Sequence, residues 1–129
     1  MRPTTLKELG WLHDSVVLNV IYDASQDAGR LLKLVICCHP DCGYEPWEGK
    51  NLVITAVNVA VIKYVVWGWV TAPETIDSIQ PGVSKAVEES TMRAKRAGAR
   101  FPNLELTISF HSGSQLEIIC QDLQVKVES

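Results

Sequence analysis

The sequence predicts a single α+β domain over residues 1–129 in which antiparallel β-structure dominates. Three observations predict this fold class. Apolar and polar residues alternate strictly over 104–110, a long apolar stretch at 52–70 is rich in valine, and one helical segment carries matched start and stop signals. We therefore expect about six strands, arranged as a sandwich or a partial barrel, with one main helix near 84–97 and a short N-terminal helix.

Composition and charge narrow the class of protein further. Apolar residues make up 47% of the 129-residue chain, and only 21% are charged, which gives a mean hydropathy of +0.07. This content is sufficient for a closed core and is not typical of a disordered chain. Twelve Lys and Arg against fifteen Asp and Glu give a net charge of −3, which argues against a nucleic-acid partner.

The first elements follow from capping and turn signals. Thr5 and Glu8 have the spacing of a capping box, and this predicts a short helix over 6–12. Apolar runs at 16–22 and 31–38 predict two strands, and the polar segment 23–29 between them has turn composition. The simplest arrangement of these two strands is an antiparallel hairpin.

The middle of the chain is expected to be a loop over 39–50 followed by a bent pair of strands. The apolar stretch 52–70 is too long for one ordinary strand, and Asn58 is the expected break, giving strands near 52–56 and 59–67. Lys63 and the many β-branched residues argue against a membrane span. Gly68 marks a bend, and 71–82 is expected to be irregular.

The last part of the chain predicts the main helix and three strands. Ser84 is a helix N-cap residue, and Gly98 supplies a left-handed stop. Strands are expected over 104–110, 116–120 and 123–127, with a bulge at 121–122. The basic residues of 93–100 are interpreted as cations that complement the helix dipole rather than as a phosphate site.

A cysteine-rich loop is the first candidate for metal chemistry. Cys37, Cys38, His39 and Cys42 offer thiolate and imidazole ligands, but the second pair of a zinc knuckle is missing. Cys37 and Cys38 also point to opposite faces of a continuous strand. We expect reduced, metal-free thiols in a cytoplasmic protein without a cofactor, and a metal or thiol enzyme using the Cys37–Cys42 loop is kept as an alternative.

The remaining cysteine and histidine residues show no pattern typical of a catalytic site in the sequence. Cys120 lies in an apolar alternation and is expected in the core. His13 and Asp14 are adjacent on a predicted turn, where such residues more often cap neighbouring backbone groups. No phosphate-binding, dinucleotide or zinc-protease motif occurs in the chain. No catalytic residue is therefore assigned, and the balance is against an enzyme.

Four tryptophans are numerous for this length, and they provide the candidate contact residues. Trp47, with Tyr44 beside it in the 39–50 loop, is expected to be an exposed anchor for a protein contact. Unpaired sheet edges offer a second route to association, including self-association. Trp67 and Trp69 suggest the alternative of a small apolar ligand carried in a barrel cavity.

Several short motifs, spread over most of the chain, resemble those of a group of small bacterial β-rich domains. They are Leu12-His13-Asp14-Ser15, a strand that ends Tyr22-Asp23, the run from Phe110-His111-Ser112-Gly113-Ser114 to Leu116-Glu117-Ile118, and Leu123 with Val125. Some members of that group resemble immunity proteins of polymorphic toxin systems, which bind and block a partner toxin. The resemblance implies a protein partner and no catalytic residues. The sequence therefore predicts a non-catalytic, protein-binding module, immunity-like or self-associating.

Overall fold

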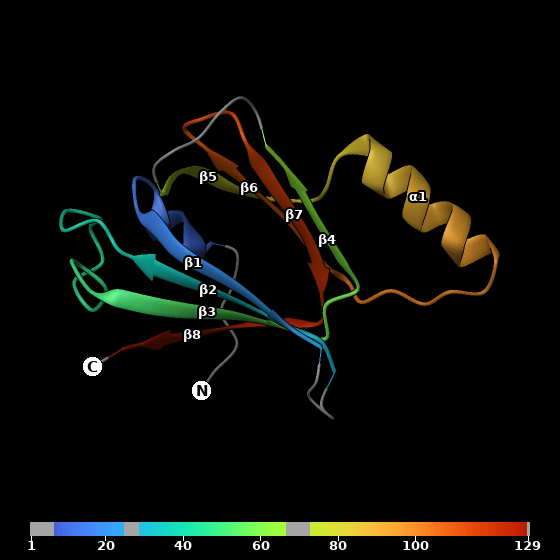
Figure 1. Ribbon diagram of the computed structural model, residues 1–129, viewed down its shortest axis with the longest axis horizontal. Coiled ribbons are helices and arrows are strands. Elements are labelled where there is room, and N and C mark those ends of the chain that lie inside the picture. Colours follow the sequence, from blue (N-terminus) through green and yellow to red (C-terminus); the bar gives the residue numbers. More distant parts are fainter. Residues whose placement is uncertain (1–6, 25–28, 67–72, 129) are drawn as a thin grey trace.

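The computed structural model describes residues 7–24, 29–66 and 73–128. These residues form eight strands, one α-helix and one short 3-10 helix (Figure 1). The elements in chain order are η1 (Glu8–Leu12), β1 (Val16–Asp23), β2 (Leu31–Cys37), β3 (Asn51–Val57), β4 (Val61–Val65), β5 (Glu74–Pro81), α1 (Lys85–Arg96), β6 (Leu104–Phe110), β7 (Gln115–Cys120) and β8 (Asp122–Val127).

All eight strands belong to one antiparallel sheet with the order β4-β7-β6-β5-β1-β2-β3-β8. The predicted hairpin of the first two strands is confirmed, since β1 pairs with β2 over its whole length. The sheet bends into two four-stranded halves, which lie at an angle to each other (Figure 1). The pairing described between the halves is short: Val16 with Thr75 and Val17 with Glu74. The α+β, mainly antiparallel class is confirmed, whereas the six-stranded sandwich or partial barrel is corrected to an open, eight-stranded sheet.

The strand for which the sequence analysis gave no range is β5, which lies in the segment expected to be irregular. Its two prolines led to that expectation, but Pro73 precedes the strand and Pro81 is its last residue. Proline is tolerated at such positions because the ladder needs few donors there. Ile76 is fully buried and anchors the strand, while a register shift between Ile76 and Ser78 leaves Asp77 in a β-bulge.

Two corners carry the chain from one half of the sheet to the other. Asn58 has a positive φ of 52° and separates β3 from β4, so the predicted break is confirmed. Gln121 separates β7 from β8, and it is therefore a corner rather than a simple bulge. The Gln121 amide donates to the Val57 carbonyl at 2.9 Å, which ties the two corners together.

The core lies between the two halves of the sheet. Leu32, Leu34 and Ile54 face it from one half, and Leu106 and Ile118 from the other. The hollow that remains among these side chains has a volume of only about 10 Å³. The interior of the described structure is therefore filled by side chains, as native packing requires.

Helix α1 begins and ends close to its predicted limits. The Ser84 hydroxyl accepts a hydrogen bond from the Val87 amide at 3.4 Å, and Gly98 follows the helix with φ +99°. The buried carboxylate of Glu117 on β7 accepts a hydrogen bond from the Ser84 amide. The helix stands beside β4 at one end of the molecule (Figure 1), so it is anchored mainly at its N-terminus.

Some predictions fall on residues outside the described ranges. These residues are Thr5, Trp67, Gly68 and Trp69. In the described ranges, the apolar stretch 52–66 forms most of β3 and all of β4. None of the helices that the structure describes has the length and apolar character needed to cross a membrane.

Candidate functional site

The aromatic corner, made of Trp11, Tyr44 and Trp47, contains the predicted contact residues. Trp47 is only 7% exposed, and its ring meets the Tyr44 ring edge-on with centroids 4.9 Å apart. Trp11 stacks on Tyr44 with ring centroids 5.9 Å apart and is itself 42% exposed. The expectation of an exposed anchor at Trp47 is therefore wrong, because the loop folds its indole onto the core. Tyr44 is half-buried, and its role in a contact stays a prediction.

The backbone at Gly43 passes close to the Trp11 ring in this aromatic corner. Gly43 has a positive φ of 93°, and a Cβ at this position would lie 3.1 Å from the Trp11 ring. Only glycine accommodates both the left-handed backbone and the indole above it. The loop is therefore shaped to pack aromatic rings together.

The cysteine-rich loop does not gather its ligands into one site. Cys37 and Cys38 face opposite sides at the end of β2, Cys38 being fully buried and Cys37 half-buried. Burial raises the pKa of the Cys38 thiol to about 11, which favours the neutral form. The His39 ring accepts a hydrogen bond from the Asp41 amide at 3.0 Å. Among the described residues, this loop holds no group of three ligand atoms close enough to share an ion.

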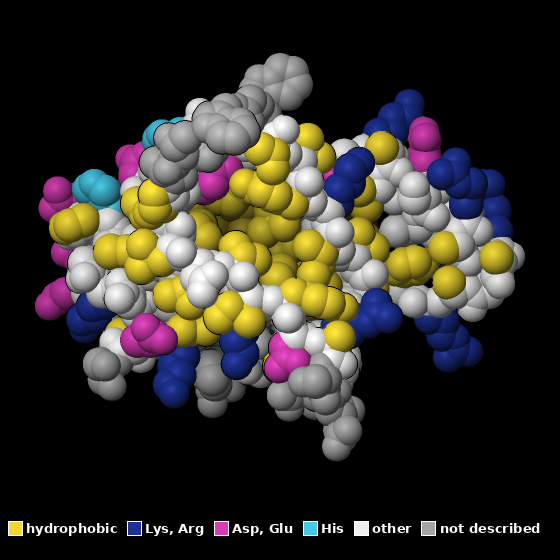
Figure 2. All heavy atoms as spheres, viewed as in Figure 1, with side chains coloured by type: hydrophobic (Ala, Val, Ile, Leu, Met, Phe, Trp, Pro, Cys, Tyr) yellow, Lys and Arg dark blue, Asp and Glu magenta, His cyan; other side chains and the backbone are white. Residues whose placement is uncertain are grey.

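A groove with mainly apolar walls runs between β1 and β4. It consists of two adjoining hollows of about 470 and 490 Å³, which share Val20 of β1 and Ile62 of β4. Apolar side chains gather around this hollow in the middle of the face in Figure 2. Leu18, Val20 and Tyr64 in its walls are each between 47% and 51% exposed. An exposed apolar surface of this kind marks a binding site more often than chance.

Both walls of the groove are unpaired strand edges. Within the described residues, β1 pairs with β5 only at Val16 and Val17, and β4 pairs only with β7. The Val20 amide donates instead to the side chain of Asn19 at 2.9 Å. Backbone donors and acceptors of both strands therefore border an apolar surface, and a further strand would satisfy them.

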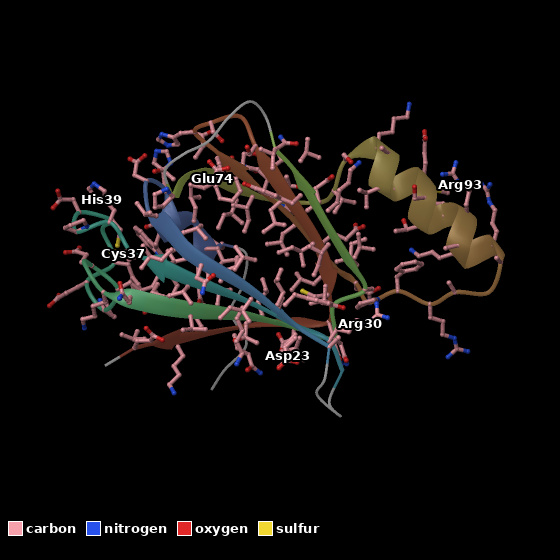
Figure 3. All side chains as sticks on the ribbon, in the orientation of Figure 1. Asp23, Arg30, Cys37, His39, Glu74 and Arg93 are labelled. Carbon is pink, nitrogen blue, oxygen red and sulfur yellow. The ribbon has the colours of Figure 1, made fainter. Side chains whose placement is uncertain are left out.

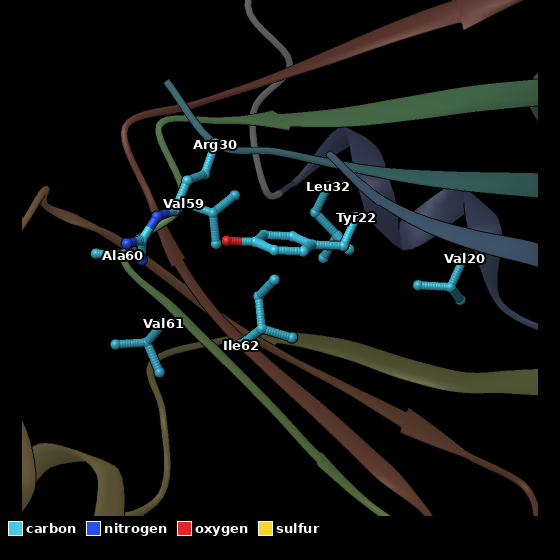
Figure 4. A pocket seen from close by; sticks show the side chains of 8 residues that line it. All are labelled: Val20, Tyr22, Arg30, Leu32, Val59, Ala60, Val61 and Ile62. Carbon is cyan, nitrogen blue, oxygen red and sulfur yellow. The ribbon is translucent and has the colours of Figure 1, made fainter. Parts of the chain in front are cut away.

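The two ends of the groove carry opposite charges. Arg30 lines the end that is built from Tyr22, Val59 and Val61, and in Figure 4 the Tyr22 ring reaches across this end from β1. Glu74 lines the opposite end. In Figure 3 the two charged residues lie well apart, Glu74 towards the upper left and Arg30 towards the lower centre. The groove is therefore apolar along its length, with a cation at one end and an anion at the other.

Glu74 is held in place by neighbouring hydroxyl groups. Its carboxylate accepts hydrogen bonds from the hydroxyls of Tyr64 at 2.7 Å and Ser112 at 3.2 Å. The Tyr64 ring also packs edge-on against Phe110, with centroids 6.2 Å apart. Burial and the adjacent Glu74 carboxylate raise the pKa of Tyr64, so its hydroxyl stays a donor. These contacts fix the charged end of the groove.

A second cluster of polar residues lies outside the groove. His13 and Asp14 follow η1, and His111 lies in the turn between β6 and β7. The structure brings these three side chains together, with His111 Nε2 3.1 Å from Asp14 Oδ1. Sequence reasoning considered His13 and Asp14 only as neighbours on a turn, because nothing in the sequence places His111 beside them.

The groove was also not located from the sequence. Its residues read as ordinary strand positions, and only the general risk of unpaired edges pointed towards it. Family models, curated proteins and solved structures gave no match to this chain.

Proposed function

We propose that this protein is a non-catalytic, protein-binding module that receives an extended segment of a partner protein in the groove between β1 and β4. The observation that carries the proposal is the coincidence of two unpaired strand edges with one apolar surface. An added strand satisfies the backbone groups of the edge, and the apolar surface receives every second side chain.

The free edge of β1 favours a partner segment that pairs with β1 as an added strand. Beyond Val17, the free edge of β1 extends over Leu18 to Tyr22 without a described strand partner. The Asn19 side chain accepts a hydrogen bond from the Val20 amide. A local side-chain hydrogen bond of this kind competes with strand pairing, and a hydrogen bond to the backbone of a partner strand can replace it. Antiparallel pairing is the natural choice, since every described strand pair in this sheet is antiparallel.

The charges at the two ends give the partner segment a direction. A strand antiparallel to β1 begins beside Arg30, near Tyr22, and ends beside Glu74, near Val17. A segment with an acidic residue at its start, apolar residues at alternate positions and a basic residue at its end is therefore complementary to the groove. This is the chemistry that we assign to the partner.

The two alternatives from the sequence receive less support. A carrier of small apolar ligands needs an enclosed cavity of several hundred Å³, whereas the enclosed hollow in the core holds about 10 Å³ and the two larger hollows of the groove are lined by exposed residues. A metal or thiol enzyme in the Cys37–Cys42 loop needs its ligands assembled, and the loop separates Cys37 from Cys38.

The test uses a synthetic peptide of defined sequence, acetyl-Glu-Val-Thr-Val-Thr-Val-Lys-amide, labelled with a fluorophore. We expect it to bind the full chain in an anisotropy titration and to protect the amides of β1 from hydrogen exchange. The Val20→Lys variant should bind at least about tenfold more weakly, because the bound segment would cover the lysine charge without providing a partner for it. Val127→Lys is the matched control, since Val127 is an exposed valine on the outer edge strand β8.

Three outcomes would contradict the proposal. Equal loss of binding in Val20→Lys and Val127→Lys would show that the groove is not the site. Equal binding of a peptide with the two terminal charges exchanged would remove the assigned direction. A dimer in light scattering that Val20→Lys dissociates would make a second copy of the chain, rather than another protein, the occupant.

A further inference from the structure

The histidine cluster, made of His13, Asp14 and His111, is independent of the groove. Its three side chains come from two turns that the sheet brings to one end of β5. The Asp14 amide donates to the Ile76 carbonyl at 2.8 Å, and the His111 amide donates to the Thr75 carbonyl at 2.9 Å. Both turns are thus fixed by neighbouring carbonyl groups on the same strand. The positions of the three side chains therefore follow from the sheet and not from chance proximity of long, mobile groups.

The bulge in β5 orients the first imidazole. His13 Nδ1 lies 2.5 Å from the main-chain carbonyl oxygen of Asp77, the bulged residue. A carbonyl can only accept, so Nδ1 carries the proton and donates. The neutral ring then has its lone pair on Nε2, which lies 3.6 Å from Asp14 Oδ2. A histidine whose other nitrogen donates to a backbone carbonyl is in the arrangement typical of metal ligands.

The Asp14 carboxylate lies between the two rings. One oxygen faces His13 Nε2 at 3.6 Å, and the other faces His111 Nε2 at 3.1 Å. One ligand atom from each of the three residues lies within 4.8 Å of the other two. Ligands that each lie about 2.0–2.1 Å from a tetrahedral zinc ion are about 3.4 Å from one another. The His13–Asp14 and His111–Asp14 separations, 3.6 and 3.1 Å, lie on either side of this value, but they are measured to different oxygens of the carboxylate. A shared ion therefore requires the three side chains to close around it from separations of up to 4.8 Å.

Asp14 adopts an uncommon backbone conformation at this point. Its φ is +66°, in the left-handed region that non-glycine residues enter at a cost. The three side chains are each about half exposed, so water has access to the remaining coordination positions. The next carboxylate, that of Asp77, lies 3.8 Å from His111 Nε2.

The geometry points to a site for a divalent transition-metal ion such as Zn²⁺. The ion would be held by His13 Nε2, His111 Nε2 and the Asp14 carboxylate. Two imidazoles and one carboxylate select such an ion over Ca²⁺ or Mg²⁺, which prefer oxygen ligands alone. Three protein ligands with solvent on the open side leave coordination positions for water or for a group of a partner.

The test is a titration of the full, metal-free chain with Co²⁺, followed by visible absorption, and then displacement by Zn²⁺. We expect one Co²⁺ per chain, with the absorption of a four- or five-coordinate ion, and its loss on addition of one equivalent of Zn²⁺. His111→Ala and Asp14→Asn should each weaken binding at least tenfold, since loss even of an outer partner costs about 10–100-fold. His39→Ala is the matched control because His39 lies in the cysteine-rich loop, outside the cluster.

A second measurement does not depend on any variant. In the wild-type chain, substoichiometric Co²⁺ should broaden the ring NMR signals of His13 and His111 and leave those of His39 sharp. Binding that survives in His111→Ala, or that is lost in His39→Ala, would overturn the assignment. The absence of stoichiometric binding at millimolar Zn²⁺ would overturn it as well, and would make the cluster an ion pair between imidazoles and a carboxylate.

Discussion

At the scale of single residues, Trp47 is the bulkiest buried side chain of the 39–50 loop. It is 7% exposed and packs against Tyr44, so its truncation leaves a cavity that the loop cannot refill. We expect Trp47→Ala to lower the free energy of unfolding by about 3–5 kcal/mol, measured by urea unfolding. Trp11→Ala should cost less than half as much, because Trp11 is already 42% exposed. A loss below about 1 kcal/mol for Trp47→Ala would mean that the loop packs differently.

At the scale of elements, the contact between Glu117 and the N-terminus of α1 holds the helix to the sheet. Glu117 is 2% exposed, and its carboxylate accepts from the Ser84 amide at the positive end of the helix dipole. Removing the acceptor leaves the half-buried Ser84 amide without this partner, so Glu117→Ala should cost about 1–3 kcal/mol. Amide exchange in the first turn of α1 should then accelerate, which hydrogen-exchange mass spectrometry measures directly.

The matched control for this contact is Glu88→Ala. Glu88 also lies in the first turn of α1 but is exposed, so it contributes about 0.3–1 kcal/mol through the dipole alone. Equal effects of the two variants would show that the buried hydrogen bond to Ser84 does not anchor the helix.

At the scale of the whole molecule, the two fully buried thiols predict how stability depends on pH. Burial raises the pKa of Cys38 and of Cys120 from 9.0 to about 11 in the folded protein. Between these values the unfolded chain has lost thiol protons that the folded chain keeps, so the free energy of unfolding falls as pH rises. Below pH 9 both states are protonated, and the thiols add no pH dependence.

Urea unfolding between pH 8 and pH 11 measures how the free energy of unfolding changes with pH. The variants are compared by this slope and not by their absolute stability. Cys120→Ala should flatten the alkaline decrease, because it removes one of the two buried thiols. An unchanged slope in Cys120→Ala would contradict the assignment of the raised pKa to burial of that thiol.

Local signals in the sequence determined the fold class and most element positions. The strict alternation over 104–110, the cap at Ser84 and the break at Asn58 each depend on a few adjacent residues, and each is confirmed. The burial of Cys120 also follows from the pattern around it. Such features are predictable because backbone dihedrals, caps and side-chain periodicity act over one or two turns of chain.

Tertiary structure alone decided which surfaces carry candidate sites. The short pairing of β1 with β5 leaves the rest of β1 facing β4, and this creates the groove. The same strand, β5, holds the turns of His13 and His111 together. Trp47 is buried because its loop folds onto the core. These outcomes depend on contacts between residues distant in sequence, whose energies arise only once the sheet has bent, so no local pattern encodes them.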